Sequence, residues 1–262
     1  MKTKILIATH KLESVIDNEI FKPAQVGSAI NQYTINSTYI KDNTGDNISD
    51  KNSTFNELTA IYWAWKNLKD EAVFGLMHYR RFLNLFYTKP FYKNVKKDIM
   101  KQVKSNNKKL LRLNNAEQVN QKTNALLAEY DVITANPIYC SLKKKSISIA
   151  EDYKEYHLVE DWNICMDVIK EFFPEYEKSI ETYLYKGNQL YYGNIFIAKK
   201  EWFDDFCHWL FTILFEVEKR ITISEDPYQK RVIGFLSERL FTLYLLHNQF
   251  KIKSYPIFYV ED

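Results

Sequence analysis

The sequence contains little glycine and little cysteine, and each shortage excludes a class of protein. Its 262 residues include six glycines, none of them in a Gly-x-Gly-x-x-Gly or P-loop pattern, which excludes classical dinucleotide-binding dehydrogenases and P-loop kinases. The three cysteines, Cys140, Cys165 and Cys207, have no Cys-x-x-Cys spacing. They suit neither a disulfide framework nor a zinc knuckle, so we expect buried thiols in a reducing compartment.

Long hydrophobic runs are also missing. No apolar run approaches the roughly 18 to 20 residues that a membrane span requires, and residues 5–9 are too few for the core of a signal peptide. The chain is 46% hydrophobic and 26% charged, with a formal net charge of +3, which is typical of a globular protein with ample room for a core. The sequence therefore predicts a cytoplasmic protein with a single domain over residues 1–262.

Short apolar runs followed by polar clusters indicate where a ligand binds. Such runs are typical of strands buried on both faces of a parallel sheet, and ligands of these sheets bind at the carboxyl ends of the strands. Two of the clusters carry cations, which suits an anionic small ligand such as a nucleotide diphosphate. The expected strands are residues 4–8, 73–77 and 131–135, and the clusters that follow them are residues 9–11, 78–81 and 136–137.

The remaining elements predict an α/β fold with a mostly parallel central sheet flanked by helices. Thr54 and Glu57 have the spacing of a capping box, which predicts a helix from there to about Lys69. We find no internal repeat, which favours one domain. Further helices are expected at about 159–173, 201–221 and 229–247, and further strands at 190–198 and 257–260.

The basic character of the chain is concentrated in residues 93–122, which hold nine basic and two acidic residues. We expect a helical insert outside the core. The stretch has few aromatic residues, and the isoelectric point of about 8.5 does not favour nucleic-acid binding. A solvated helix face is one interpretation, and peripheral contact with anionic lipid at the inner face of the membrane is the other.

Four motifs of the sequence together resemble those of a known family. They are THK at 9–11, GDNIS-x-KN-x-x-F-x-ELTA-x-YWAWKN at 45–67, GL-x-HYRRFL at 75–83 and GN-x-FI-x-KK-x-x-FD at 193–204. The resemblance extends from Ile5 to about Tyr244 and is to the bacterial capsular and exopolysaccharide glycosyltransferases catalogued as domain of unknown function 4422. It implies a GT-A-like fold that transfers a hexose, in some members galactose or galactofuranose, from a nucleotide sugar to a saccharide or polyprenyl-diphosphate-linked acceptor.

The resemblance also raises the question of how the diphosphate is held. Most GT-A enzymes use a divalent metal, Mn²⁺ or Mg²⁺, bound by Asp-x-Asp at a strand end. At the corresponding strand end this sequence has His78-Tyr79-Arg80-Arg81, which contains no carboxylate. We therefore predict no obligatory metal, with guanidinium groups in its place. Adjacent residues of an extended segment point to opposite faces, so one of Arg80 and Arg81 is expected to contact the diphosphate and the other to be structural.

Further donor-binding residues come from two strand ends and one polar loop. Lys11 is expected to add a positive charge, and Thr9 and His10 to contact the base or ribose. Asp46 and Asn47 are donor-binding candidates, with a plain Asx-turn as the alternative. His78 and Tyr79 complete the expected donor site, with a satisfied core histidine as the alternative for His78.

For the general base, the resemblance implies Glu238, on the second helix after the Gly193–Asn194 motif, where GT-A enzymes place their catalytic carboxylate. An exposed ion pair with Arg239 is the alternative. Asp152 and Asp161 are rival candidates for the base or, together with His157, for contact with the acceptor. Gly193 and Asn194 are expected to contact the acceptor or the donor sugar, because a glycine in a buried strand often marks close approach by a ligand. A non-catalytic sugar-nucleotide or glycan-binding protein is the alternative function.

Overall fold

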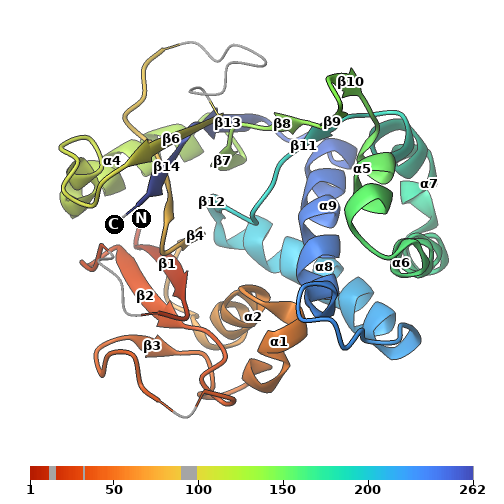
Figure 1. Ribbon diagram of the computed structural model, residues 1–262. Helices are drawn as coiled ribbons and strands as arrows, with labels where there is room; N and C mark the ends of the chain where they lie inside the picture. Colours follow the sequence, from red (N-terminus) through yellow and green to blue (C-terminus); the bar gives the residue numbers. More distant parts are fainter. Residues whose placement is uncertain (12–15, 32, 90–98, 262) are drawn as a thin grey trace.

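The centre of the fold is a mixed β-sheet, seen in a computed structural model that describes residues 1–11, 16–31, 33–89 and 99–261 (Figure 1). Its strand order is β13-β7-β12-β4-β1-β2-β3. β12 runs antiparallel to its neighbours β4 and β7, and the other pairs along this path are parallel. The strands are β1 (Thr3–Thr9), β2 (Phe21–Gln25), β3 (Ile40–Lys41), β4 (Val73–His78), β7 (Val132–Ala135), β12 (Phe196–Lys199) and β13 (Ile252–Tyr255).

A second group of strands extends the sheet beyond the end of β4. β5 (Arg81–Leu83) folds back antiparallel onto β4, and β14 (Ile257–Val260) lies between β5 and β6 (Met100–Val103). The short strands β8 (Ile138–Tyr139) and β11 (Gln189–Leu190) form an antiparallel pair, as do β9 (Ser141–Leu142) and β10 (Lys145–Ser146).

Helices cover both faces of the sheet. The α5 to α9 helices gather on one side of the molecule, and α4 lies on the other side (Figure 1). The α-helices are α1 (Asn52–Phe55), α2 (Leu58–Asn67), α4 (Ala116–Leu127), α5 (Ile149–Tyr156), α6 (Val159–Phe172), α7 (Glu177–Ser179), α8 (Lys200–Arg220) and α9 (Val232–His247). Shorter turns are η1 (Ser49–Lys51), η2 (Leu111–Asn114), η3 (Pro174–Tyr176), η4 (Ile180–Tyr185), which is a π-helix, and η5 (Gln229–Arg231).

Two apolar clusters form the core, one on each face of the sheet. Because successive side chains of a strand point to opposite faces, Leu6 and Ala8 of β1 pack with the α8 and α9 side, whereas Ile5 and Ile7 pack with the α4 side. This explains why the strands read as continuous apolar runs. The fold therefore confirms the predicted α/β class with a mostly parallel sheet flanked by helices.

Most elements lie where the sequence places them. The three apolar runs form β1, β4 and β7, and the helices expected near 159–173, 201–221 and 229–247 are α6, α8 and α9 with η5. Pro174 follows the end of α6, because proline cannot continue a helix. All three cysteines are buried and free, as predicted.

The predicted capping box at Thr54 and Glu57 is wrong. Asn52–Phe55 is a separate turn of helix, α1, and Asn56 then adopts a positive φ of 52° before α2 begins at Leu58. Thr54 lies inside this turn, where its hydroxyl donates to the carbonyl of Lys51, so it does not cap the helix that was expected to follow it. This break in the helix frees the carboxylate of Glu57 for another partner.

The predicted strand over residues 190–198 is also wrong in its middle. Leu190 ends β11, and β12 begins only at Phe196. Gly193 and Asn194 form a turn between the two strands, with φ of 79° and 50°. The glycine therefore permits a left-handed backbone rather than a close contact inside a strand.

The prediction of a helical insert at 93–122 fails for part of that range. Residues 93–98 lie outside the described residues, and Met100–Val103 is the strand β6, paired with β14. Val103, Leu113 and Val119 are buried in the core, so this stretch belongs to the fold.

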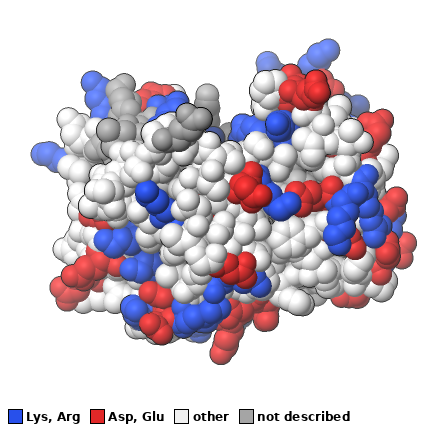
Figure 2. Space-filling model, turned by 90° about the horizontal axis from the view of Figure 1, so that it is seen from below, with Lys and Arg blue, Asp and Glu red and all other residues white. Residues whose placement is uncertain are grey.

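The face shown in Figure 2, which lies at the bottom of Figure 1, carries charges of both signs. Lys and Arg side chains lie among Asp and Glu side chains there and do not merge into a single basic surface.

In the described part of the chain, no helix combines the length and the apolar character that crossing a membrane would need.

Candidate active site

Two adjoining pockets lie where β1 and β4 end. The larger has a volume of about 720 Å³ and the smaller about 360 Å³. Both are lined by Glu57, His78 and Arg81, together with Asn56 and Arg231. A molecule in one pocket can therefore meet a molecule in the other across these shared side chains.

The end of β4 supplies the polar wall common to both pockets. His78 and Arg81 are directly paired across the β4–β5 hairpin, and opposite residues of an antiparallel pair present their side chains on the same face. The segment is thus a hairpin and not the extended run expected from the sequence. Arg80 and Arg81 both line the larger pocket, and Arg81 also lines the smaller one.

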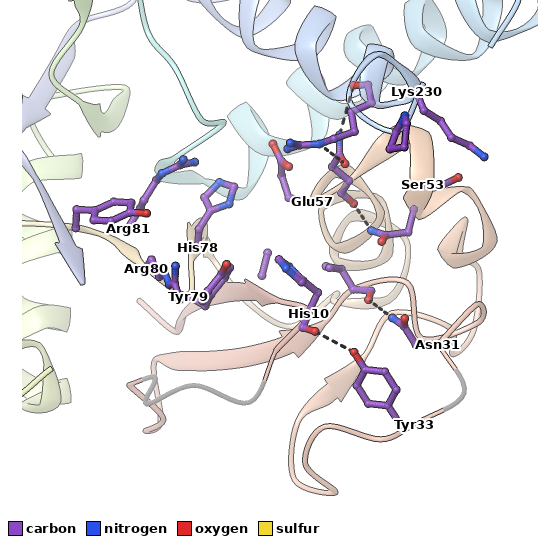
Figure 3. A pocket seen from close by; sticks show the side chains of 17 residues that line it. His10, Asn31, Tyr33, Ser53, Glu57, His78, Tyr79, Arg80, Arg81 and Lys230 are labelled. Atoms are coloured by element: carbon purple, nitrogen blue, oxygen red, sulfur yellow. Dashed lines mark hydrogen bonds between the residues drawn. The ribbon is translucent and has the colours of Figure 1, made fainter. Parts of the chain in front are cut away.

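Cations dominate the described lining of the larger pocket. It holds four Lys or Arg side chains and one carboxylate, that of Glu57. In Figure 3, His78 and Arg81 approach the pocket from one side and Lys230 from the side opposite, with Glu57 between them. His10 forms the floor and packs edge-on against Tyr79, with ring centroids 5.2 Å apart. Such a lining favours an anion that carries several negative oxygens. The four cations are Arg80, Arg81, Lys230 and Arg231.

The smaller pocket has a balanced charge. Its described lining holds three arginines, Arg81, Arg231 and Arg239, and three carboxylates, Glu57, Asp152 and Glu238. Arg239 pairs with Asp152 at 3.2 Å and with Glu238 at 3.3 Å, and its side chain is only 7% exposed. The Glu238–Arg239 pair is therefore mostly buried, unlike the exposed pair that was the alternative from the sequence.

The turn at Gly193 and Asn194 holds three of the polar side chains. The amide of Gly193 donates to Glu238 Oε1 at 3.0 Å, and its carbonyl accepts a hydrogen bond from His78 Nε2. Asn194 Nδ2 donates to Glu57 Oε1 and to Ser237 Oγ, both at 2.8 Å. Neither Gly193 nor Asn194 belongs to the described lining of these two pockets. They position the groups that do.

Burial shifts the pKa values of two of these groups. It raises the pKa of the Glu238 carboxyl, and the charge of Glu57 raises it further, against the lowering effect of Arg239. Burial lowers the pKa of His78, so its imidazole is favoured in the neutral form. Because a carbonyl only accepts, Nε2 of the neutral ring carries the proton given to Gly193, and Nδ1 is left as an acceptor.

The corner of the chain that carries Glu57 packs closely against α9 and the turn before it. Asn56, at the corner between α1 and α2, hydrogen-bonds with Arg231 through its side chain. A Cβ added at Gly234 would lie 2.1 Å from Asn56 Nδ2. A larger residue at position 234 would therefore displace the Asn56 amide, which contacts Arg231.

Several residues predicted from the sequence lie outside both pockets. The hydroxyl of Thr9 donates to the carbonyl of Lys11 at 2.7 Å, which makes a local turn, and the Lys11 side chain is exposed. Asn47 also makes local turn contacts, and Asp46 accepts from the Tyr62 hydroxyl. The contact of Asn47 with the Ser49 amide matches the Asx-turn alternative, whereas Asp46 contacts a side chain of α2. Asp161 is buried in the first turn of α6, where burial raises its pKa to about 6.

The site also contains residues that sequence reasoning missed. The sequence predicts Glu57 as a capping residue and names Arg239 only as the partner in an exposed ion pair. It gives no role to Asn56, Lys230 or Arg231. No local signal indicates this role of Glu57, because Phe55 and Leu58 have the spacing of one helix face and so predict a helix that continues through Glu57. By contrast, His10, His78, Tyr79, Arg80, Arg81, Asp152, His157 and Glu238 do line the pockets.

Comparison with known proteins identifies the family. The model of the family described as domain of unknown function DUF4422 matches residues 4–249. The chain belongs to this family. No curated protein matches it.

Among solved structures, this DUF4422 chain is similar to the apo structure of the WbbM bifunctional glycosyltransferase. The TM-score is 0.88 and the sequence identity 29%, over 100% of this chain and 46% of that one. The chain thus spans just under half the length of that protein. The match confirms the resemblance seen in the motifs and supports a glycosyltransferase role.

The described lining of the DUF4422 pocket fits guanidinium groups on a diphosphate better than a divalent metal. Among the described residues, no three His, Cys, Asp or Glu side chains are placed so that together they could hold a metal ion. In the larger pocket, Oε1 of the single carboxylate, Glu57, already accepts from Asn194. Hard cations such as Mg²⁺ prefer oxygen ligands, whereas the arginines of this pocket would repel them. Metal dependence itself stays a prediction.

Proposed function

We propose that this chain transfers a hexose from a nucleotide-diphosphate sugar, UDP-linked, to a saccharide or lipid-linked acceptor. The observation that carries the proposal is the meeting of a cation-lined pocket with a charge-balanced one at Glu57, His78 and Arg81. The donor occupies the larger pocket and the acceptor the smaller. The family resemblance supports a place in assembling bacterial capsule, exopolysaccharide or O-antigen, with galactose and galactofuranose as the first donor sugars to test.

The arginines stabilise the departing diphosphate. A guanidinium presents a planar fork that matches phosphate oxygens, and a hydrogen bond to a charged group is worth roughly 1.5–3 kcal/mol. Arg81 lies at the junction of the pockets, where the bond to the leaving group breaks, whereas Arg80 also lies near the Tyr79 ring, 5.3 Å from its centroid. Fixed cations aimed at developing negative charge lower the barrier without reorganisation.

Glu238 acts as the general base in this proposal. As a hydroxyl oxygen of the acceptor bonds to the anomeric carbon, its proton passes to Glu238. The bond from the anomeric carbon to the diphosphate breaks, and the electron pair leaves with the diphosphate. A raised carboxyl pKa brings the base nearer to the working pH, which favours proton transfer. Glu57, at the junction, faces the positive charge that develops on the sugar ring.

A transfer assay tests this function. Purified protein is incubated with a panel of UDP-sugars and candidate acceptor glycosides, and free UDP and glycosylated product are measured together. We expect one donor to give both, and Glu238→Gln to abolish product while Glu117→Gln, an exposed glutamate of α4, does not. UDP-sugar binding without any product would favour the sugar-nucleotide-binding alternative.

Location at the inner face of the membrane is part of the same proposal. Lys101, Lys104, Lys108 and Lys109 of the basic stretch are exposed, and clustered lysines add roughly 1 kcal/mol each near anionic lipid. Sedimentation with anionic vesicles, compared with neutral vesicles, tests this contact. Equal partition into both would contradict it, and we expect no binding to nucleic acid in the same buffer.

A further inference from the structure

We infer that the smaller pocket is a subsite for a neutral sugar ring, which stacks on Tyr228 while its hydroxyls pair with Asp152 and Arg239. This inference rests on the proposed function and specifies its acceptor. The acceptor is recognised by a terminal neutral sugar residue, whatever carrier that sugar is attached to.

The first observation is an aromatic wall with one open side. The Tyr228 ring packs against His157, with centroids 5.8 Å apart and planes 16° apart, and against Phe235 at 5.0 Å. Tyr228 nevertheless remains 52% exposed. All three line the smaller pocket. Apolar CH groups on the face of a sugar ring suit such an open aromatic surface, because contact removes both from water.

The second observation is that the wall is held in place before any ligand binds. Asp226 Oδ1 accepts from the backbone amides of Tyr228 and Gln229, at 3.0 and 2.8 Å. The Gln229 side chain in turn donates to the carbonyl of Tyr156 at the end of α5. These bonds tie the loop that carries Tyr228 to the opposite rim, so little conformational entropy is lost when a ligand stacks there.

The third observation is the charge of the pocket. The three described arginines are matched by three carboxylates, and His157 adds no charge near neutral pH because burial lowers its pKa to about 4. Asp152 and Arg239 form a paired acceptor and donor at 3.2 Å. A sugar hydroxyl both donates and accepts, so it can bind such a pair. A diphosphate or a uronic acid would instead meet the carboxylates.

The difference in charge between the two pockets indicates which substrate binds in each. Four cations face one carboxylate in the larger pocket, and the exposed tyrosines Tyr156 and Tyr228 line the smaller one. The anionic donor is thus drawn to the first, and a neutral ring is favoured in the second.

Saturation-transfer NMR on the full chain tests the subsite, with methyl hexosides of several configurations as probes and the matching methyl hexuronides for comparison. We expect at least one neutral hexoside to bind and its hexuronide to bind more weakly. Tyr228→Ala should weaken hexoside binding by about tenfold, as expected for loss of one aromatic contact of about 1.4 kcal/mol. Tyr228→Phe, which keeps the ring, should lose less.

The same titrations include a control variant, and they define the results that would contradict the inference. Phe172→Ala removes an aromatic ring that is 40% exposed and lies outside both pockets, and it should bind hexosides as the unmodified chain does. Equal hexoside binding by Tyr228→Ala, tighter binding of hexuronides, or binding of farnesyl diphosphate in place of hexosides at Tyr228 would overturn the inference. UDP titrated in parallel reports on the donor pocket, so a failed subsite and a failed glycosyltransferase function are distinguished.

Discussion

Asn194 donates a hydrogen bond to Glu57 at 2.8 Å, although 137 residues separate the two along the chain. The same amide nitrogen donates to Ser237, which lies beside Glu238 on α9. Gly193, the residue before Asn194, binds Glu238 through its amide. One turn just before β12 therefore sets the positions of Glu57, which both pockets share, and of Glu238, which lines the smaller pocket.

Replacing Asn194 is expected to lower kcat, because Glu57 loses the hydrogen bond that positions its carboxylate. Asn194→Gly keeps the backbone at its φ of 50° but loses both side-chain bonds, so we expect kcat to fall more than KM changes. Asn194→Ala loses the same bonds and adds strain of about 1–2 kcal/mol from a left-handed alanine. Urea unfolding should show Asn194→Ala as the less stable of the two; equal stability would contradict the assigned backbone strain.

Loss of Arg81 is expected to weaken donor binding at least tenfold, because each hydrogen bond to a charged group is worth roughly 1.5–3 kcal/mol. Calorimetric titration with UDP measures this. Arg80→Ala should have the smaller effect, since Arg80 lines only the larger pocket. Lys69→Ala, an exposed cation at the end of α2, is the control for loss of one charge. A larger effect of Arg80→Ala would reverse the assignment.

The strand ends could be predicted from the sequence because short apolar runs followed by His78 and Arg81 carry a local signal. The role of Glu57 could not be predicted, because Thr54 three residues before it matches the pattern of a capping box. The residue that positions Glu57 is Asn194, which lies 137 residues away along the chain. The Gly193 turn was read as a strand because its flanking residues are apolar. Arg231 enters the site only through the packing of α9 on the Asn56 corner, which no local pattern encodes.

The acid limb of the pH profile for kcat/KM should lie at higher pH than an ordinary glutamate would give. The base works as the carboxylate, and burial raises the Glu238 pKa, so activity is lost as the pH falls through that raised value. Initial rates between pH 4 and 8 measure the limb. An acid limb at the ordinary glutamate pKa would exclude Glu238 as the group that titrates.

The stability of Glu238→Gln separates catalysis from folding. A carboxyl whose pKa is raised in the folded state costs stability as the pH rises above its unfolded value. Glu238→Gln should therefore be as stable as the unmodified chain at pH 7, or more so, while its activity is lost. A marked fall in its melting temperature would mean that Glu238 acts structurally.

His157 should make stability depend on pH between about 4 and 6.5, the range between its folded and its usual pKa. The unfolded chain binds a proton there that the folded chain does not, so stability rises with pH across this window. His157→Phe keeps an aromatic ring against Phe235. It should reduce the slope of stability against pH by up to the amount that the uptake of one proton contributes. Urea unfolding at several pH values tests it, and an unchanged slope would contradict a neutral, buried His157.

The central claim is that arginines, and not a metal, hold the diphosphate of the donor. The most direct measurement is the thermal stability of the protein with each UDP-sugar, in manganese and in EDTA, because a ligand that binds only the folded state raises the melting temperature. We predict a rise that survives EDTA, is lost in Arg81→Ala and remains in Lys69→Ala. A rise that requires manganese and persists in Arg81→Ala would contradict the claim.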